Sequence, residues 1–186
     1  MGVDVTLDME SYNYEFFSLS VRAGRFDVFE HRWTKSSTEE MYVMDANSLY
    51  ASIARDLKVP VGTYEIITNL SVTSKITFDS VKKTHVLNGT EMVGFAMLEV
   101  FSPSSEIPFM GVKVGQKYIY TLCNECAKKK KKSMCRHGEK SRKIIATLTW
   151  PEINFMVGSL GYSIGHIFEV YQWAEKKQYL QSLFSS

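Results

Sequence analysis

The sequence has few of the features that mark export, membrane insertion or a disulfide-stabilised fold. It contains only three cysteines and four prolines among 186 residues, and no stretch approaches the roughly 18 consecutive apolar residues of a membrane span. The first residues lack the basic region and apolar run of a secretory signal. An odd cysteine count also argues against disulfides. We therefore expect an intracellular protein with no membrane partner, in which the cysteines serve another purpose.

What is present is the composition of one ordinary globular domain or a piece of a larger protein, with 45% apolar and 23% charged residues. The net charge of +2 conceals an uneven distribution. Residues 126–143 hold nine basic residues and one acid, a net charge of +8, so the rest of the chain carries −6. Such segregation is typical of contact with a polyanion or, alternatively, of a solvated basic loop.

The hydrophobic patterns predict a fold of the α+β class. Residues 12–29 read as strand, turn and strand, and Asn88-Gly89 is a strong hairpin signal. Residues 41–44 read as a short strand that ends at Asp45, after which the spacing of apolar residues becomes helical until Pro60-Val61-Gly62.

The C-terminal third is predicted to form a helix, a strand and a closing helix. Thr149-Trp150-Pro151-Glu152 has the pattern of a capping box, so we expect a helix over residues 150–160 that ends before Gly161. Residues 164–173 are β-branched and aromatic, which predicts a strand with a mainly buried aromatic face. Residues 175–184 are predicted to form the closing helix.

All three cysteines fall in one short segment together with a histidine. Cys123 and Cys126 are separated by two residues, and Cys135-Arg136-His137 follows after eight more. This spacing predicts a tetrahedral Cys₃His site for structural Zn²⁺, with free thiols on a loop as the alternative. The basic tip between the two pairs would then contact nucleic-acid phosphates, or act as a nuclear localisation signal; its lysines are Lys128, Lys129, Lys130, Lys131 and Lys132.

Asp45 stands where the predicted strand meets the predicted helix. A carboxylate held there could bind Mg²⁺ while the free amides of the helix start bind phosphate. The simpler alternative is that Asp45 caps the helix.

The pattern Asp45-x-x-Ser48-Leu49-Tyr50-x-Ser52 resembles the first palm motif of family B DNA polymerases, D-x-x-S-L-Y-P-S. Ala23-Gly24-Arg25 is similar to the glycine pair of the linker that precedes the palm in this family. The cysteine–histidine segment and residues 161–173 resemble the region after the palm strand in the protein-primed branch, found in viral, linear-plasmid and Maverick/Polinton-type elements. The resemblance covers residues 20–184.

This resemblance implies roles for individual residues. Asp45 would be one of two aspartates that hold a catalytic Mg²⁺ pair, with the Ala46 carbonyl near the second ion. The amides of Ser48 and Leu49 would contact the incoming triphosphate, Tyr50 would pack against the deoxyribose as a steric gate, and Gly24 and Arg25 would contact DNA. The implied partners are a DNA template and primer, a deoxynucleotide and a terminal protein primer, and the implied state is a monomer in the nucleus or associated with a virus or element.

The departures from the family pattern limit what the chain does alone. Ala51 replaces the motif's proline, and Val21 and Ala23 replace the linker's tyrosine and first glycine. No K-x-x-x-N-S-x-Y-G helix and no Y-x-D-T-D strand are found in the sequence. We therefore expect a fragment or truncated product that is inactive by itself.

The resemblance also gives an expected division of the chain. The expected parts are a linker region at 1–40, a partial palm at 41–120, a zinc loop at 121–143 and a continuation toward fingers and palm at 144–186. The competing hypothesis is a non-catalytic, zinc-stapled basic module that binds nucleic acid or a partner protein.

Overall fold

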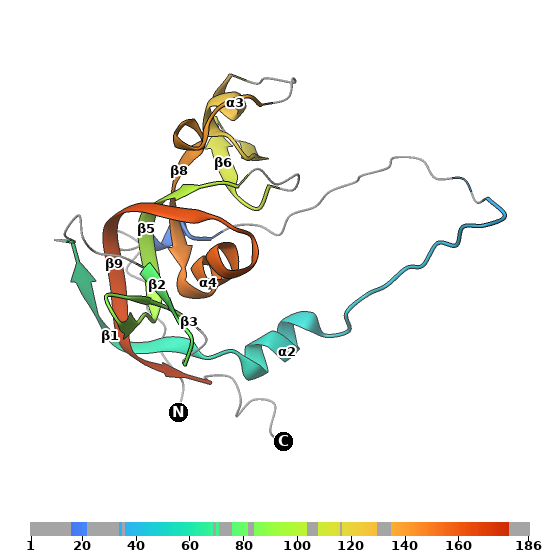
Figure 1. The fold of residues 1–186 in the computed structure, drawn as a ribbon. Helices are drawn as coiled ribbons and strands as arrows, with labels where there is room; N and C mark the ends of the chain where they lie inside the picture. The colour runs from blue at the N-terminus through green and yellow to red at the C-terminus, as the bar shows by residue number, and fades with distance from the viewer. Residues whose placement is uncertain are drawn as a thin grey trace. The chain divides into compact units, whose positions relative to one another are not determined.

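The fold is described from a computed structural model, which covers residues 16–21, 34, 36–68, 70, 76–81, 84–103, 108–115, 117–129 and 135–178 (Figure 1). The chain divides into two compact units, residues 1–21 with 60–175 and residues 22–59 with 176–186. We describe each unit by itself. Among the described helices, none has the length and apolarity needed to cross a bilayer.

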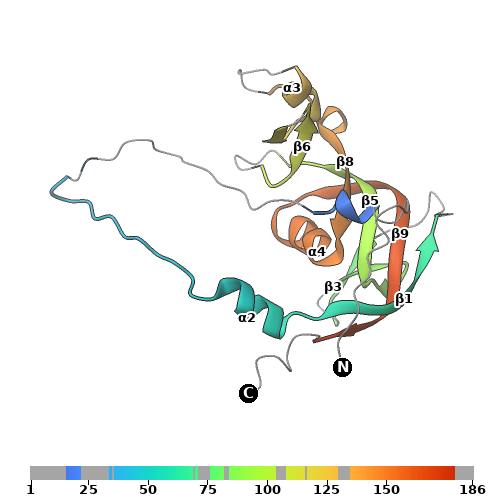
Figure 2. The same cartoon turned by 180° about the vertical axis from the view of Figure 1, so that it is seen from behind.

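The largest sheet of the described chain has four strands in the order β1-β9-β5-β8 (Figure 2). The strands are β1 (Val59–Ile67), β5 (Gly94–Phe101), β8 (Lys143–Thr149) and β9 (Ser163–Lys177). β5 pairs antiparallel with both β8 and β9, and the β5–β9 register shifts near Leu98, which marks a β-bulge. Because burial along β5 alternates residue by residue, its two faces meet two different apolar clusters.

The main core lies between one face of this sheet and α4 (Trp150–Ser159). Leu98 and Leu148 of the sheet and Ile153 and Met156 of the helix are at most 1% exposed. As predicted, Thr149 and Glu152 form a capping box at the start of α4. Gly161 after the helix has φ +70°, the left-handed conformation expected at a helix end.

The second face of the sheet carries an aromatic cluster. Phe16, Tyr171 and Trp173 are its buried members, and the rings of Phe16 and Tyr171 stack with centroids 4.1 Å apart. Phe16–Ser18 is helical, so the predicted strand is wrong for these residues, and most of residues 12–29 lie outside the described part. The prediction of buried aromatics on the 164–173 strand is confirmed for Tyr171 and Trp173.

A second, smaller sheet contains β2 (Ile76–Asp79), β3 (Thr84–Leu87) and β4 (Thr90–Glu91). The predicted turn at Asn88-Gly89 is confirmed, since both residues have positive φ and Leu87 pairs with Thr90. The sheet is fastened to α4 because the indole N–H of Trp150 donates to the carbonyl of His85 at 2.9 Å.

The remaining elements of the larger unit form one compact module. They are the hairpin β6 (Gly111–Val114) and β7 (Lys117–Tyr120), the short helix α3 (Asn124–Lys128) and the 3₁₀ turn η1 (Glu139–Arg142). The module leads directly into β8, which begins at Lys143.

The smaller unit differs from the prediction at its centre. Residues 39–46 have no regular structure, so the strand predicted at 41–44 is wrong for this structure; Val43 and Met44 are each 91% exposed. A strand requires a hydrogen-bonded neighbour, and no described strand pairs with this segment. Its apolar residues were therefore not sufficient to make it a strand.

The two boundaries that follow also differ. Helix α2 (Leu49–Asp56) ends before Leu57, and Pro60 and Gly62 lie inside β1 instead of ending the helix. At the other end of the chain, residues 175–177 continue strand β9, so the closing helix is wrong there; residues 179–184 of that prediction lie outside the described part. Pairing within the sheet prevailed over the helical spacing of the closing segment.

Candidate metal sites

The first candidate site surrounds the start of α2. The N-cap residue is Ser48, which has φ 55° and ψ 35°, a left-handed conformation that a serine rarely adopts. No side chain caps the helix, so the alternative role of Asp45 as a cap is not found. Asp45 is exposed, and its carboxylate has no hydrogen-bond partner in the described part of the chain.

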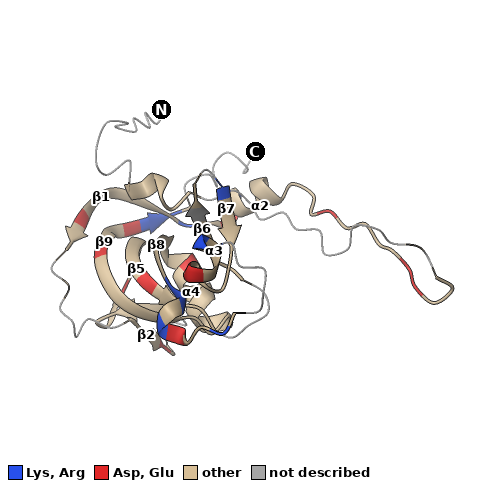
Figure 3. Cartoon of the chain, turned by 90° about the horizontal axis from the view of Figure 1, so that it is seen from above, with Lys and Arg blue, Asp and Glu red and all other residues tan. Residues whose placement is uncertain are grey.

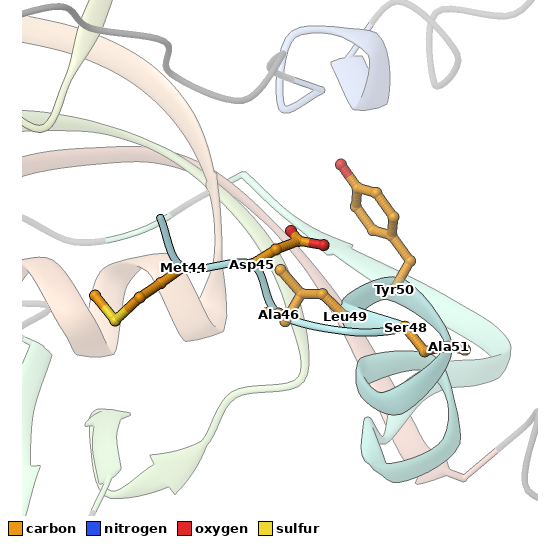
Figure 4. A pocket seen from close by; sticks show the side chains of 7 residues that line it. All are labelled: Met44, Asp45, Ala46, Ser48, Leu49, Tyr50 and Ala51. Carbon is orange, nitrogen blue, oxygen red and sulfur yellow. The ribbon is translucent and has the colours of Figure 1, made fainter. Parts of the chain in front are cut away.

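An open hollow runs along this segment (Figure 4). Its lining residues are Met44, Asp45, Ala46, Ser48, Leu49, Tyr50 and Ala51. In Figure 4 the carboxylate of Asp45 and the ring of Tyr50 both extend away from the backbone, and Tyr50 is 89% exposed. The amide of Ser52 donates to the carbonyl of Ser48 at 2.9 Å, which leaves the preceding first-turn amides without an intrahelical acceptor.

The structure thus brings four predicted residues together with Asp45 on one short segment. They are Ala46, Ser48, Leu49 and Tyr50. Within the described chain, no group of three or more His, Cys, Asp or Glu ligands includes Asp45. A hard divalent cation needs six to eight oxygen ligands, so this segment offers part of a Mg²⁺ site.

The second candidate site is fully assembled from one segment of the larger unit. The ligand atoms of Cys123, Cys126, Cys135 and His137 all lie within 4.8 Å of one another, as the spacing predicted. Nδ1 of His137 is 3.3 Å from the sulfurs of Cys123 and Cys126 and 3.4 Å from that of Cys135. In a tetrahedral zinc site, bonds of about 2.3 Å to sulfur and 2.0–2.1 Å to nitrogen give sulfur–nitrogen separations of about 3.5 Å. The cluster therefore fits Zn²⁺.

Local hydrogen bonds explain why this backbone brings Cys123 into place. The hydroxyl of Thr121 accepts from the amide of Cys123 at 3.0 Å, and helix α3 then carries Cys126 one turn onward. Cys123 is 1% exposed, and its sulfur lies 3.8 Å from the carbonyl of Ser141 in η1. The site is closed by protein on all four sides of the tetrahedron, which is the arrangement of a structural and not a catalytic zinc.

Two longer-range contacts join this module to the end of strand β5. The buried hydroxyl of Ser102 donates to the carbonyl of Leu122. The guanidinium of Arg142 bridges two carbonyls, donating to His137 at 3.0 Å and to Pro103 at 3.1 Å. Sequence reasoning missed Ser102 and Arg142, because their partners are set by folding and no local pattern marks them.

The thiols of the cluster do not ionise independently. Burial raises the pKa of Cys126 to about 11, and the neighbouring Cys135 and Cys123 thiols add to this effect. Burial also acts to raise the pKa of Cys135, but hydrogen bonds from the His137 amide and the adjacent ligand side chains prevail and lower it to about 7. One thiol is therefore ready to lose its proton near neutral pH, as metal binding requires.

The basic residues next to the cluster are only partly covered by the structure. Lys128 and Lys129 at the end of α3 are exposed, and Lys129 lies 3.6 Å from Glu125, one turn back. Figure 3 marks the lysines and arginines of the described chain in blue. The predicted DNA-contacting residues Lys130, Lys131, Lys132, Gly24 and Arg25 lie outside the described residues.

The structure therefore shows a mixed α and β fold with antiparallel sheets, a Cys₃His cluster that could hold a metal ion and an exposed carboxylate beside a helix start. Residues 8–184 match the family model described as DNA polymerase type B, organellar and viral. The chain belongs to this family of type B DNA polymerases. No match is found among curated proteins or solved structures.

Proposed function

We propose that this chain supplies the first catalytic carboxylate of a DNA-directed DNA polymerase that adds deoxynucleotides to a primer terminus. The observation that carries the proposal is the state of Asp45, which is exposed and not used as a helix cap or in any hydrogen bond to the described chain. An exposed carboxylate without a protein partner keeps its oxygens available to a hard metal ion. Membership of the type B polymerase family supports the proposal that this carboxylate is a Mg²⁺ ligand.

The neighbours of Asp45 have complementary roles in this proposal. The amides of Ser48 and Leu49 bind the triphosphate, because backbone donors at a helix start favour anions. The Ala46 carbonyl would be available to the second metal ion, and Tyr50 would pack against the deoxyribose and disfavour a 2′-hydroxyl. The exposure of Tyr50 supports this assignment, since no described residue buries its ring.

Asp45 alone is not sufficient for catalysis. Two Mg²⁺ ions about 3.5–4 Å apart need more than one carboxylate, and the sequence contains no Y-x-D-T-D strand. The proposal therefore assigns only one carboxylate of the metal pair, Asp45, and expects that the chain by itself does not extend a primer. We assign residues 41–120 to a polymerase palm and place the chain in the protein-primed branch. The basis is the series of motifs, ending at Trp173, that occur in the same order as in that branch.

The Cys₃His cluster has a structural role in this proposal. Zn²⁺ bound there fixes the two ends of the lysine segment and holds its positive charge outward, toward nucleic-acid phosphates. Replacing the five lysines 128–132 by glutamine would reduce the slope of log affinity against log salt by up to about 4, because each lost phosphate contact removes about 0.7–0.9. An unchanged slope would overturn this part of the proposal.

The Asp45 assignment is tested by measuring the binding of Mn²⁺ together with dATP. Electron paramagnetic resonance detects the bound Mn²⁺. We expect Asp45→Asn to weaken formation of the protein–Mn²⁺–dATP complex at least 10-fold. The matched control is Asp56→Asn at the end of the following helix α2, where the Asp56 carboxylate pairs with Arg55 at 2.7 Å. Equal Mn²⁺–dATP binding by the Asp45→Asn protein and the parent would contradict the proposal.

A second candidate function is a non-catalytic module that binds nucleic acid through the zinc-stapled basic segment. It is favoured by one observation: the ligands of the Cys₃His cluster are assembled, whereas Asp45 lies on a segment without regular structure. The two functions separate cleanly in the experiments above. The module hypothesis expects DNA affinity that depends on the lysines and Mn²⁺–dATP binding that does not depend on Asp45.

A further inference from the structure

The hairpin β6–β7 presents two tyrosine rings on one face. Its register pairs Gly111 with Tyr120, so Tyr118, two residues before, shares that face. A Cβ atom at Gly111 would lie 3.4 Å from Cδ1 of Tyr118 and 3.5 Å from Cε1 of Tyr120. Both rings therefore lean over the glycine backbone.

The opposite face of the hairpin is directed inward, because Val112 packs against the main core. The tyrosine face is consequently the outer one, and Tyr118 is 50% exposed. A ring that covers glycine on one side and meets solvent on the other has a free π surface. That surface is fixed in place at little entropic cost, since a tyrosine side chain on a hairpin has few rotatable bonds.

The sequence segment that contains this face is strongly basic. Residues 108–143, which contain the hairpin and the cluster, hold eleven basic and two acidic residues, a net charge of +9, against −7 for the rest of the chain. Lys117 of β7 and Lys128 of α3 are both exposed. Of the described aromatic side chains in this basic segment, only that of Tyr118 is at least half exposed.

We propose that the zinc module binds single-stranded DNA, with an unpaired base stacked on Tyr118 and the backbone phosphates held by exposed lysines of the module such as Lys117 and Lys128. In a duplex the base faces are covered by their neighbours, so a stacking ring favours an unpaired strand. An aromatic platform inside a basic surface is the combination by which proteins hold single strands without reading their sequence. This inference rests on the proposed contact between the module and nucleic acid, and it names the form of nucleic acid.

The experiment measures fluorescence anisotropy of labelled oligodeoxythymidine and of a labelled duplex with the zinc-loaded chain. Tyr118→Ala removes the ring, Tyr118→Phe keeps it, and Phe155→Ala removes an aromatic side chain of similar exposure, 47%, on α4. Loss of one stacked base predicts about a 5- to 150-fold weaker affinity of Tyr118→Ala for the single strand. Tyr118→Phe and Phe155→Ala are expected to stay within about twofold of the parent. The salt slope of Tyr118→Ala should equal that of the parent, because no phosphate contact is lost.

Two results would overturn the inference. One is unchanged single-strand affinity of the Tyr118→Ala protein, and the other is an equal loss for duplex and single strand. Neither result would contradict the proposed contact with phosphates. That contact is tested separately by the slope of log affinity against log salt for the lysine variant. Circular dichroism and zinc content of each variant verify that the module is still folded.

Discussion

Zinc binding should hold the module of residues 111–142 closed, and its removal should open that module while leaving α4 intact. The perturbation is Cys135→Ser, which removes one ligand from a cluster whose ligand atoms lie within 4.8 Å of one another. The matched control is Arg136→Lys, which changes an exposed residue between two ligands and keeps the charge.

The magnitude follows from the loop that the metal closes. Cys126 and Cys135 enclose a loop of ten residues, and a cross-link over about ten residues reduces the entropy of the open chain by the equivalent of about 3 kcal/mol. Since 1.4 kcal/mol corresponds to a factor of ten, amides inside the module should exchange about 100-fold faster without zinc.

Hydrogen exchange followed by NMR or mass spectrometry measures this directly. The reporters are the amides of Ala127, Lys129 and Ser141, which donate to backbone carbonyls at 3.0–3.2 Å. The amide of Leu160, which donates to Met156 at 3.2 Å in α4, should not change. The reasoning would be refuted if the module amides of the parent exchanged equally fast with and without zinc. It would also be refuted if the amide in α4 lost as much protection as those in the module.

Three further predictions concern the larger unit. Thr149→Ala removes the side chain that accepts from the Glu152 amide and should lower the free energy of unfolding by about 1 kcal/mol in urea denaturation; no change would contradict the role of the capping box. Gly94→Ala should destabilise the sheet by more than about 3 kcal/mol, because its φ is +143° and the new Cβ would lie 2.1 Å from the carbonyl oxygen of Tyr171, whereas Gly138→Ala meets no atom within 4 Å and should be near neutral in the same assay. Lys143, 2.7 Å from Glu99, donates the hydrogen bond that most lowers the pKa of that carboxyl. The resulting stability is present above the ordinary glutamate pKa of about 4.3 and is lost as the pH falls through the lower, folded value. Glu99→Gln should therefore flatten the acid side of the stability–pH curve, and an unchanged curve would contradict this account.

Local patterns were sufficient where a short segment determines its own structure. The capping box at Thr149 and the turn at Asn88-Gly89 formed as predicted, because their hydrogen bonds and positive φ values involve residues only a few positions apart. The Cys₃His ligands also came together as predicted, since metal-ligand spacing is local.

The pattern failed where pairing with a distant segment decides the structure. Residues 41–44 are apolar enough for a strand, yet none of the described strands pairs with them. Residues 175–177 have helical spacing, yet they extend a strand whose neighbours lie far away in the sequence.

In the candidate sites, too, residues whose contacts lie far away in the sequence could not be predicted. Arg142, which joins the module to β5, contacts Pro103 across 39 positions, and no sequence pattern marks such a contact. Tyr118 gains its significance only from the register of the hairpin and from Gly111 opposite it.

The most direct test of the account is Fe²⁺-mediated cleavage of the chain in the presence of dATP and ascorbate. Fe²⁺ in a Mg²⁺ site reduces added hydrogen peroxide to hydroxide and a hydroxyl radical, and ascorbate returns the resulting Fe³⁺ to Fe²⁺. The radical cuts the backbone next to the metal, and mass spectrometry locates the cut. Cleavage within residues 44–50 that requires dATP and disappears in the Asp45→Asn protein is the predicted result. Cleavage that persists in that variant, or that occurs only elsewhere in the chain, would contradict the role of Asp45 as a metal ligand.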